Sequence, residues 1–171
     1  NLLSNNYQVA AEETLKANSE NINNPQVKSA LMQVFDRFVK AQTDVYKTYD
    51  NLAEYAPDYS EIHYNRAVLN VSLANQKAQF YSQVADQEYI NQTVVPDIRE
   101  NFEDAVKHSK KAAEMSNKVT TWFMRSMSLE RLGDVINDDP ELKKEKYKEA
   151  GLSYLHTALL PLTEATQKEN Q

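Results

Sequence analysis

Apolar residues recur every three or four positions through most of the chain, which is the pattern of amphipathic α-helices. The clearest stretch spans residues 25–56, where Asn24 is suited to cap a helix and Pro25 to occupy its first position. We therefore predict a single helix of about 30 residues, about 45–48 Å long at 1.5 Å per residue. Its apolar stripe is Val27, Leu31, Val34, Phe38, Ala41, Val45, Tyr49, Leu52 and Ala56.

A tight corner at Ala56-Pro57-Asp58 ends this stripe. Pro57 lacks the N–H that a continuing helix needs, and its ring disfavours helical geometry at the preceding residue. Asp58 or Ser60 can accept hydrogen bonds from the first N–H groups of a second helix. The stretch 44–73 is therefore predicted to be a helical hairpin, and nothing in the sequence interrupts its second helix before Ile90.

The rest of the chain continues the helical pattern. Further helices are predicted from Pro96 to Ser116, from Val119 to a C-terminal Gly133, and from about Pro140 to Pro161, which kinks or ends the last one. The expected connections are a loop at 91–95 and another at 137–140. We expect residues 1–23 to form a short helix and a polar connection, residues 24–161 to form the hairpins, and residues 162–171 to fray.

Composition narrows the fold class. The chain of 171 residues contains only two glycines and no cysteine. Because β-rich folds need glycine in their turns, we predict one all-α domain of about five to six helices, some of them long. The absence of cysteine rules out disulfides and thiolate metal sites.

Charge argues against two classes of partner. The net charge is -6, and the basic run at 143–148 alternates with glutamates as a solvated helix face does. We therefore expect no nucleic-acid binding, which requires a clustered basic face. No run of residues is apolar enough to insert into a membrane.

Two segments of the chain echo each other. They are residues 62–76 (IHYNRAVLNVSLANQ) and 121–134 (TWFMRSMSLERLGD), each with an arginine followed by a small residue, Ala67 or Ser126. Small residues let two helix backbones approach closely. Together with the Ala-Pro corner, this pattern resembles the tetratricopeptide repeat family over residues 44–161.

The resemblance implies antiparallel hairpins stacked as a right-handed superhelix with a concave binding face. The spacing departs from the 34-residue unit of that family, so the helices must be longer or extra turns inserted. An up-and-down bundle of long helices, with the small residues simply in its core, is the alternative.

In the family, ligands lie along the first helix of each pair. Carried over, that face contains Glu61, Tyr64, Val68, Val71, Thr120, Phe123, Met127 and Glu130. Aromatic and methionine side chains would suit a peptide, although the same residues could instead be buried against a neighbouring helix. Arg66 and Arg125 could bind carboxylates or phosphates of a partner, or could pair with acidic residues nearby.

No arrangement of residues points to catalysis or to a cofactor. His63, His108 and His156 are interpreted as isolated surface or packing residues, without a second ligand at helical spacing. No glycine-framed nucleophile is present. We therefore predict a protein that is not an enzyme and binds neither metal nor cofactor.

The resulting hypothesis is a non-catalytic scaffold module that binds a protein or peptide. One alternative is an extracytoplasmic helical-bundle sensor for a small ligand, and a more distant one is an accessory domain of a membrane glycan ligase or polymerase. The chain begins at Asn1, so we expect a piece of a larger bacterial protein, with a slight preference for an extracytoplasmic place. The oligomeric state is left open.

Overall fold

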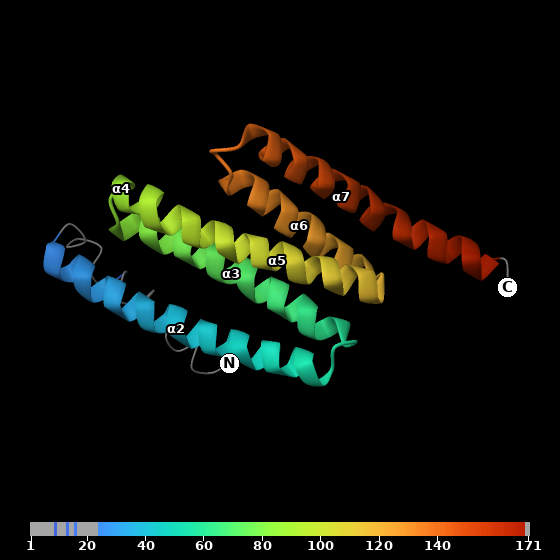
Figure 1. Ribbon diagram of the computed structural model, residues 1–171, viewed down its shortest axis with the longest axis horizontal. Coiled ribbons are helices and arrows are strands. Elements are labelled where there is room, and N and C mark those ends of the chain that lie inside the picture. The colour runs from blue at the N-terminus through green and yellow to red at the C-terminus, as the bar shows by residue number, and fades with distance from the viewer. Residues whose placement is uncertain (1–8, 10–12, 14–15, 17–23, 170–171) are drawn as a thin grey trace.

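The computed structural model (Figure 1) describes Val9, Glu13, Lys16 and residues 24–169, with side chains up to Pro161. This part of the chain is all-α and contains no strand. Most of the segment 1–23, where a short helix was predicted, lies outside the described residues. The elements are α2 (Pro25–Tyr55), α3 (Ser60–Val84), α4 (Gln87–Tyr89), the π-helix η2 (Ile90–Val94), α5 (Val95–Ser116), α6 (Val119–Val135) and α7 (Pro140–Glu169).

The first predicted hairpin is confirmed in its helices and corrected in its cap. The side chain of Asn24 accepts a hydrogen bond of 2.9 Å from the Gln26 N–H, and α2 then runs for 31 residues to the Ala56-Pro57 corner. The prediction that Asp58 or Ser60 caps the second helix is wrong. The N-cap position of α3 is Tyr59, whose side chain makes no capping bond.

The second helix ends earlier than its sequence allows. It stops at Val84, and the Asp86 side chain accepts a bond of 2.8 Å from the Tyr89 N–H, which starts the return segment. The predicted loop at 91–95 is therefore wrong, because these residues are helical. The Val95 N–H bonds to the Ile90 carbonyl five residues back, as in a π-helix, just before Pro96, which has no N–H to donate.

The predicted end of the helix that begins near Pro96 is confirmed. Asn117 (φ 47°, ψ 34°) ends α5 in the left-handed conformation, which asparagine tolerates better than most residues. The prediction that Gly133 ends its helix is wrong, because α6 continues to Val135. Gly133 instead leaves room for the side chain of a neighbouring helix. A Cβ at this position would lie 3.0 Å from the Tyr147 ring on α7. Pro161 was predicted to kink or end the last helix, and it does not end α7, which is helical to Glu169.

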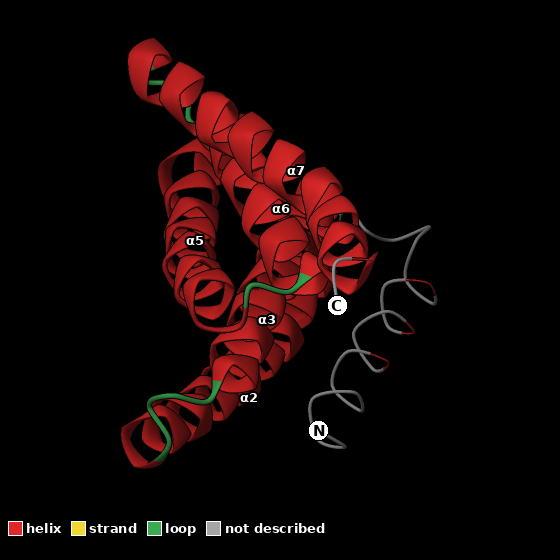
Figure 2. Cartoon of the chain, turned by 90° about the vertical axis from the view of Figure 1, so that its right-hand side faces the viewer, coloured by secondary structure: helices red, strands yellow, loops and turns green. Residues whose placement is uncertain are grey.

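The helices form an open stack in chain order. Contacts join α2 to α3, α3 to α5, α5 to α6 and α6 to α7, with a smaller contact between α3 and α6. Figures 1 and 2 show α2 at one edge of the stack and α7 at the other. Aromatic packing joins α2 to α3, where Phe35 stacks on Phe80 with ring centroids 4.0 Å apart. The helices therefore form a layered array. One groove lies between α2 and α5, and a pocket lies between α3, α5 and α6.

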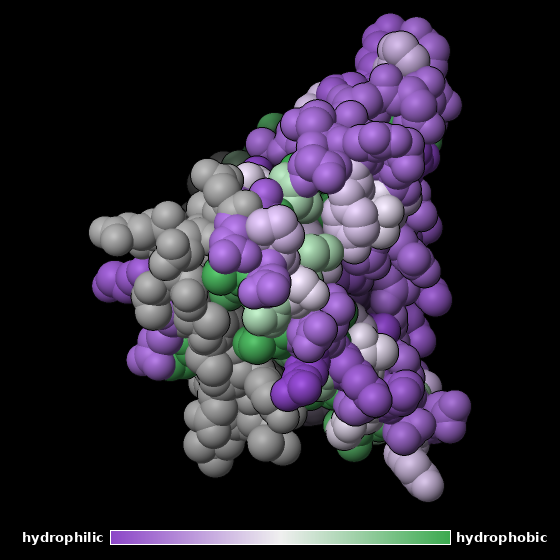
Figure 3. Space-filling model, turned by 90° about the vertical axis from the view of Figure 1, so that its left-hand side faces the viewer, coloured by the Kyte–Doolittle hydropathy of each residue, from purple (hydrophilic) through white to green (hydrophobic). Residues whose placement is uncertain are grey.

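The surface agrees with the charge pattern. The end of the molecule drawn in Figure 3 is largely hydrophilic where it is described, and its apolar side chains show only as small patches. None of the helices in the described ranges carries an apolar stretch long enough to cross a lipid bilayer.

Candidate functional site

Helix α3 separates the predicted site residues into two sets. Successive residues of an α-helix are rotated by about 100°, so positions two apart face nearly opposite sides. Tyr64 and Val68 therefore lie on another side of α3 from Arg66, which contacts Tyr46 and Asp50 of α2 and Asp104 of α5. The same spacing separates Phe123 from Arg125 on α6. The predicted residues consequently belong to two surfaces.

The first surface is an apolar groove over α3, α5 and α6. The stripe of Tyr64 and Val68 continues along α3 at helical spacing to Asn75, Ala78 and Ser82. The last three line a pocket of about 260 Å³. On α6, helical spacing carries the stripe of Phe123, Met127 and Glu130 on to Asp134, which lines the same pocket. Phe123, Glu130 and Asp134 also contact tyrosines of α7. The pocket is lined by Asn75, Ala78, Tyr81, Ser82, Ile90, Val94, Val95, Ile98, Phe102, Arg131, Asp134 and Val135.

The π-helix forms one wall of this pocket through Ile90 and Val94. Short π-helical segments occur often at functional sites, because their extra residue per turn displaces side chains from the regular helical pattern. Nothing in the local sequence marks this segment apart from the proline that follows it. This wall was therefore missed by the sequence interpretation.

The predicted residues on this groove differ in exposure. Tyr64, Val68 and Met127 are half-buried against the core, and Val71 is buried. Phe123 is 49% exposed and meets the Tyr154 ring edge-to-face at 5.9 Å. This surface is thus partly core and partly accessible.

The polar residues at the groove have partners within the chain. Glu61 accepts a bond of 3.1 Å from Lys118, which lowers the pKa of Glu61. Glu130 accepts a bond of 2.7 Å from the Tyr154 hydroxyl, and burial together with this bond raises the pKa of Tyr154 to about 12. Thr120 is exposed at the start of α6.

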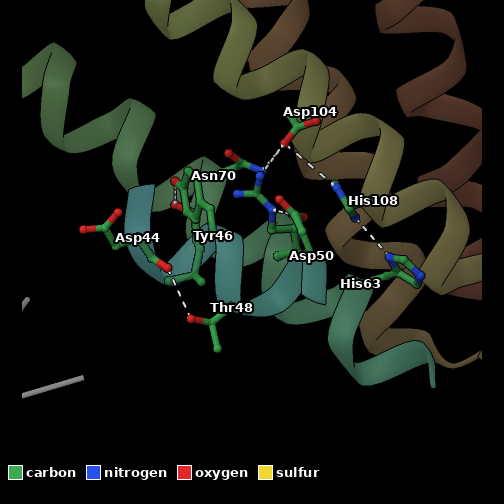
Figure 4. A network of polar contacts seen from close by, with 10 residues as sticks. Asp44, Tyr46, Thr48, Asp50, His63, Asn70, Asp104 and His108 are labelled. Carbon is green, nitrogen blue, oxygen red and sulfur yellow. Dashed lines mark hydrogen bonds and ion pairs between the residues drawn. The ribbon is translucent and has the colours of Figure 1, made fainter. Parts of the chain in front are cut away.

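The second surface is centred on Arg66, which is buried. Figure 4 labels residues around it, among them Tyr46, Asp50, Asn70 and Asp104. The Arg66 guanidinium lies 3.8 Å above the centre of the Tyr46 ring. Its Nε donates to Asp50 at 3.3 Å, and its Nη2 lies 3.2 Å from the Asp104 carboxylate. Asp104 also accepts a bond of 3.1 Å from Asn70. Arg66 is therefore fixed by its own chain, and its Nη1 has no hydrogen-bond partner in the part of the chain that the structure describes.

Lys77 repeats this arrangement three turns further along α3. Its side chain is 5% exposed, and its ammonium group lies 2.7 Å from the Asp97 carboxylate. It also donates to Asn101 at 2.9 Å. A buried charge is tolerated only when it is paired in this way. We call the polar side chains that pair between α3 and α5 the polar seam. Its members are Arg66, Asn70, Lys77, Asp97, Asn101 and Asp104.

The polar seam lies at the base of a polar groove between α2 and α5, with a volume of about 640 Å³. Its α2 wall carries Val39, Thr43 and Tyr46. Its α5 wall adds Glu100, Glu103 and Lys107 to the seam residues. The groove lies on the opposite side of α3 from the apolar pocket.

The interpretation of His63 and His108 as isolated residues is wrong. Their Nδ1 atoms are 3.0 Å apart, so one ring donates and the other accepts a hydrogen bond. Asp104 lies one helical turn before His108, with its carboxylate 4.0 Å from Nε2. Burial lowers the pKa of both rings, that of His108 to about 4. His156 is also engaged, because it lies against Trp122 and within 3.2 Å of the Asn117 side-chain oxygen.

Among the described residues, Arg125 has no acidic partner of the kind that Arg66 has. Its guanidinium carbon lies 5.3 Å from the centre of the Trp122 ring, a cation–π distance. Within the same part of the chain, its buried Nε has no hydrogen-bond partner. The two arginines of the sequence echo therefore have different surroundings.

The described residues contain no group of three or more histidine and carboxylate side chains placed to hold a metal ion. A scan against protein-family models finds no match, and searches of the curated proteins and of the solved structures find none either.

Proposed function

We propose that the chain is a non-catalytic binding module that receives a segment of a partner protein in the apolar groove between α3 and α6. The observation that carries this proposal is the apolar pocket of about 260 Å³ at the end of two continuous side-chain stripes. A concave, mostly apolar pocket with a few polar groups at its rim is typical of a ligand site.

The side chains along the groove suit a peptide. Tyr64, Val68 and Met127 offer apolar surface that needs little further ordering, and Phe123 adds an accessible ring. The rim carries Arg131, which bonds to Asp134 at 3.4 Å. An apolar side chain of the partner would fill the pocket, and its main chain would meet these polar groups.

A sensor that encloses its ligand within a closed bundle is less well supported. The ends of the described stack, α2 and α7, stand at opposite edges rather than closing around a centre (Figures 1 and 2). An open array instead presents its surface to a large partner, as helical repeat proteins do.

The test is selection of binders from a displayed random-peptide library, followed by fluorescence-polarisation titration of the selected peptides. Ala78→Trp fills the pocket and is expected to weaken binding at least about tenfold, which is about 1.4 kcal/mol. Ala158→Trp, at an exposed position of α7, is the matched control and should bind like the native chain. Selected peptides that bind both variants equally well would contradict the proposal.

A further inference from the structure

The polar groove between α2 and α5 is separate from the proposed peptide site, since it lies across α3 from the apolar pocket. From its base and its charge balance we infer that it binds a neutral, hydroxyl-rich small molecule of the size of a mono- or disaccharide. This inference does not depend on the peptide site.

The base of the groove holds a fixed, partly unused hydrogen-bond donor. The guanidinium of Arg66 is held on its face by Tyr46 and along its edges by Asp50 and Asp104. The side chain is only 9% exposed, and its Nη1, which is itself buried, has no partner among the described residues. A buried donor without an acceptor is costly. A ligand oxygen that reaches this nitrogen, after a neighbouring side chain moves aside, would remove the cost while the guanidinium stays in place.

Lys77 supplies a second donor further along the base. Two of its three N–H groups are directed to Asp97 and Asn101, at 2.7 and 2.9 Å. No further partner of its ammonium group is found among the described residues. Arg66 and Lys77 are three helical turns apart, about 16 Å along α3, so a mono- or disaccharide would bond to one of these donors and its neighbouring carboxylate rather than to both donors.

The charge of the lining selects against ions. Three cationic side chains and four carboxylates line the groove, and the cations at the base are already paired. A phosphate or carboxylate at Arg66 would be repelled by Asp50 and Asp104. A polyamine would meet the cations at the base. A neutral ligand avoids both penalties.

Hydroxyl groups suit a lining in which hydrogen-bond donors lie next to hydrogen-bond acceptors. Each hydroxyl donates one hydrogen bond and accepts up to two. Here N–H donors of Arg66 and Lys77 stand beside the carboxylates of Asp104 and Asp97. Glu100 on the α5 wall is exposed and offers a further acceptor. Adjacent hydroxyls of a sugar ring could therefore each bond to a donor and an acceptor.

The experiment is a two-dimensional amide NMR titration of the full chain with glucose, N-acetylglucosamine, maltose and lactose. Inorganic phosphate and spermidine serve as charged comparison probes. We expect saturable shifts confined to the groove, including the side-chain amides of Asn70 and Asn101, with at least one of the sugars.

Two threonines of α2 provide matched variants, since both are exposed and both bond to the carbonyl four residues back. Thr43→Trp fills the groove without touching the polar seam and should weaken sugar binding at least about tenfold. Thr48→Trp, which is not among the groove residues, should leave it unchanged.

Three results would overturn the inference. They are saturation by phosphate or spermidine but by none of the sugars, the absence of saturable shifts with every probe, and sugar binding that survives Thr43→Trp. Each can occur whether or not peptides bind across α3, because the two grooves are lined by different residues.

Discussion

The contact between α3 and α5 and the contact between α6 and α7 are both extensive, and we call them the α3–α5 seam and the α6–α7 seam. Different kinds of side chain join the helices in each. The first contains buried cations of α3, Arg66 and Lys77, paired with acids of α5. In the second, Gly133 of α6 lies against the Tyr147 ring of α7, and polar contacts lie at the rim. There the Tyr147 hydroxyl donates to Asp134 at 2.8 Å, where both side chains are exposed.

This difference predicts how each seam responds to change. Removing one partner of a buried ion pair leaves a charge that cannot be fully rehydrated, whereas losing a bond at the rim exposes groups that water can satisfy. The α3–α5 seam should therefore be sensitive to charge and pH. The α6–α7 seam should be sensitive to side-chain volume.

The largest effect is expected from Arg66→Ala. Asp50 and Asp104 lose their shared cation, and the Tyr46 ring loses the guanidinium that packs on its face. We expect a loss of about 3 kcal/mol in the free energy of unfolding, measured by urea denaturation. Arg99→Ala is the control, since Arg99 forms more exposed ion pairs with Glu103 and Asp138 and should cost less than about 1 kcal/mol. Equal losses in the two variants would show that burial of the pair does not matter.

Overpacking should affect both seams. Ala67 and Ser126 occupy matching places in the sequence echo and are both fully buried. Substituting either with leucine should destabilise the chain by about 1–3 kcal/mol, because the helices must separate to admit the side chain. Thermal melting measures this, and the exposed Ala158→Leu provides the baseline. An unchanged melting temperature for Ala67→Leu would mean that α3 makes no close crossing there.

Acidification should act through the α3–α5 seam. The folded chain holds the pKa of His108 at about 4, against 6.5 ordinarily, through burial and the nearby Arg66, His63 and Lys107, with Asp104 opposing. Burial and Lys111 lower the pKa of His63. The unfolded chain therefore binds protons between about pH 6.5 and 4 that the folded chain does not. Stability should be complete above this window and fall as the pH falls through it.

Between pH 7.5 and pH 5, we expect a loss of about 1–2 kcal/mol in the free energy of unfolding. Urea denaturation at the two pH values measures it, and His108→Gln should make the difference smaller. A difference that is unchanged in His108→Gln would place the pH sensitivity elsewhere.

The smallest effects come from the two glycines, which are both within helices. Gly151→Ala adds a methyl group into open space and should stabilise the chain by about 0.5–1 kcal/mol, by restricting the unfolded backbone. Gly133→Ala places its methyl group against the Tyr147 ring and should be about 1 kcal/mol less favourable than Gly151→Ala. Thermal melting of the two variants measures this difference. Equal gains in melting temperature would show that the Tyr147 ring moves aside without cost.

The sequence predicts the helices well wherever periodicity and local caps decide the structure. The range of α2 follows from its apolar stripe, from Asn24-Pro25 and from the Pro57 corner, and the start of α6 follows from the break at 116–117. The end of α3 could not be predicted in this way. The residues before Ile90 contain no breaker, and the turn depends on the Asp86 cap and on packing of the returning segment.

The site was less predictable because it depends on which helices become neighbours. The apolar stripe through Tyr64 and Val68 can be read from spacing alone. The partners of Arg66 cannot, since Asp50 lies on the preceding helix and Asp104 on the following one. The pairing of His63 with His108, 45 positions apart, has the same origin. The sequence does place Asp104 one helical turn before His108, but the interpretation of the histidines as isolated overlooked this spacing.

The order of the stack also bears on how the chain folds. Contacts between the described helices join near neighbours in chain order, although single pairs such as His63 and His108 are 45 positions apart, and helical topologies of this kind fold quickly. Among the described helices, α2 makes extensive contact with α3 alone, whereas α3 and α5 each have several neighbours. Local opening should therefore begin at α2, and its amides should exchange with solvent before those of α3. The opening that frees this edge would also remove one wall of the polar groove.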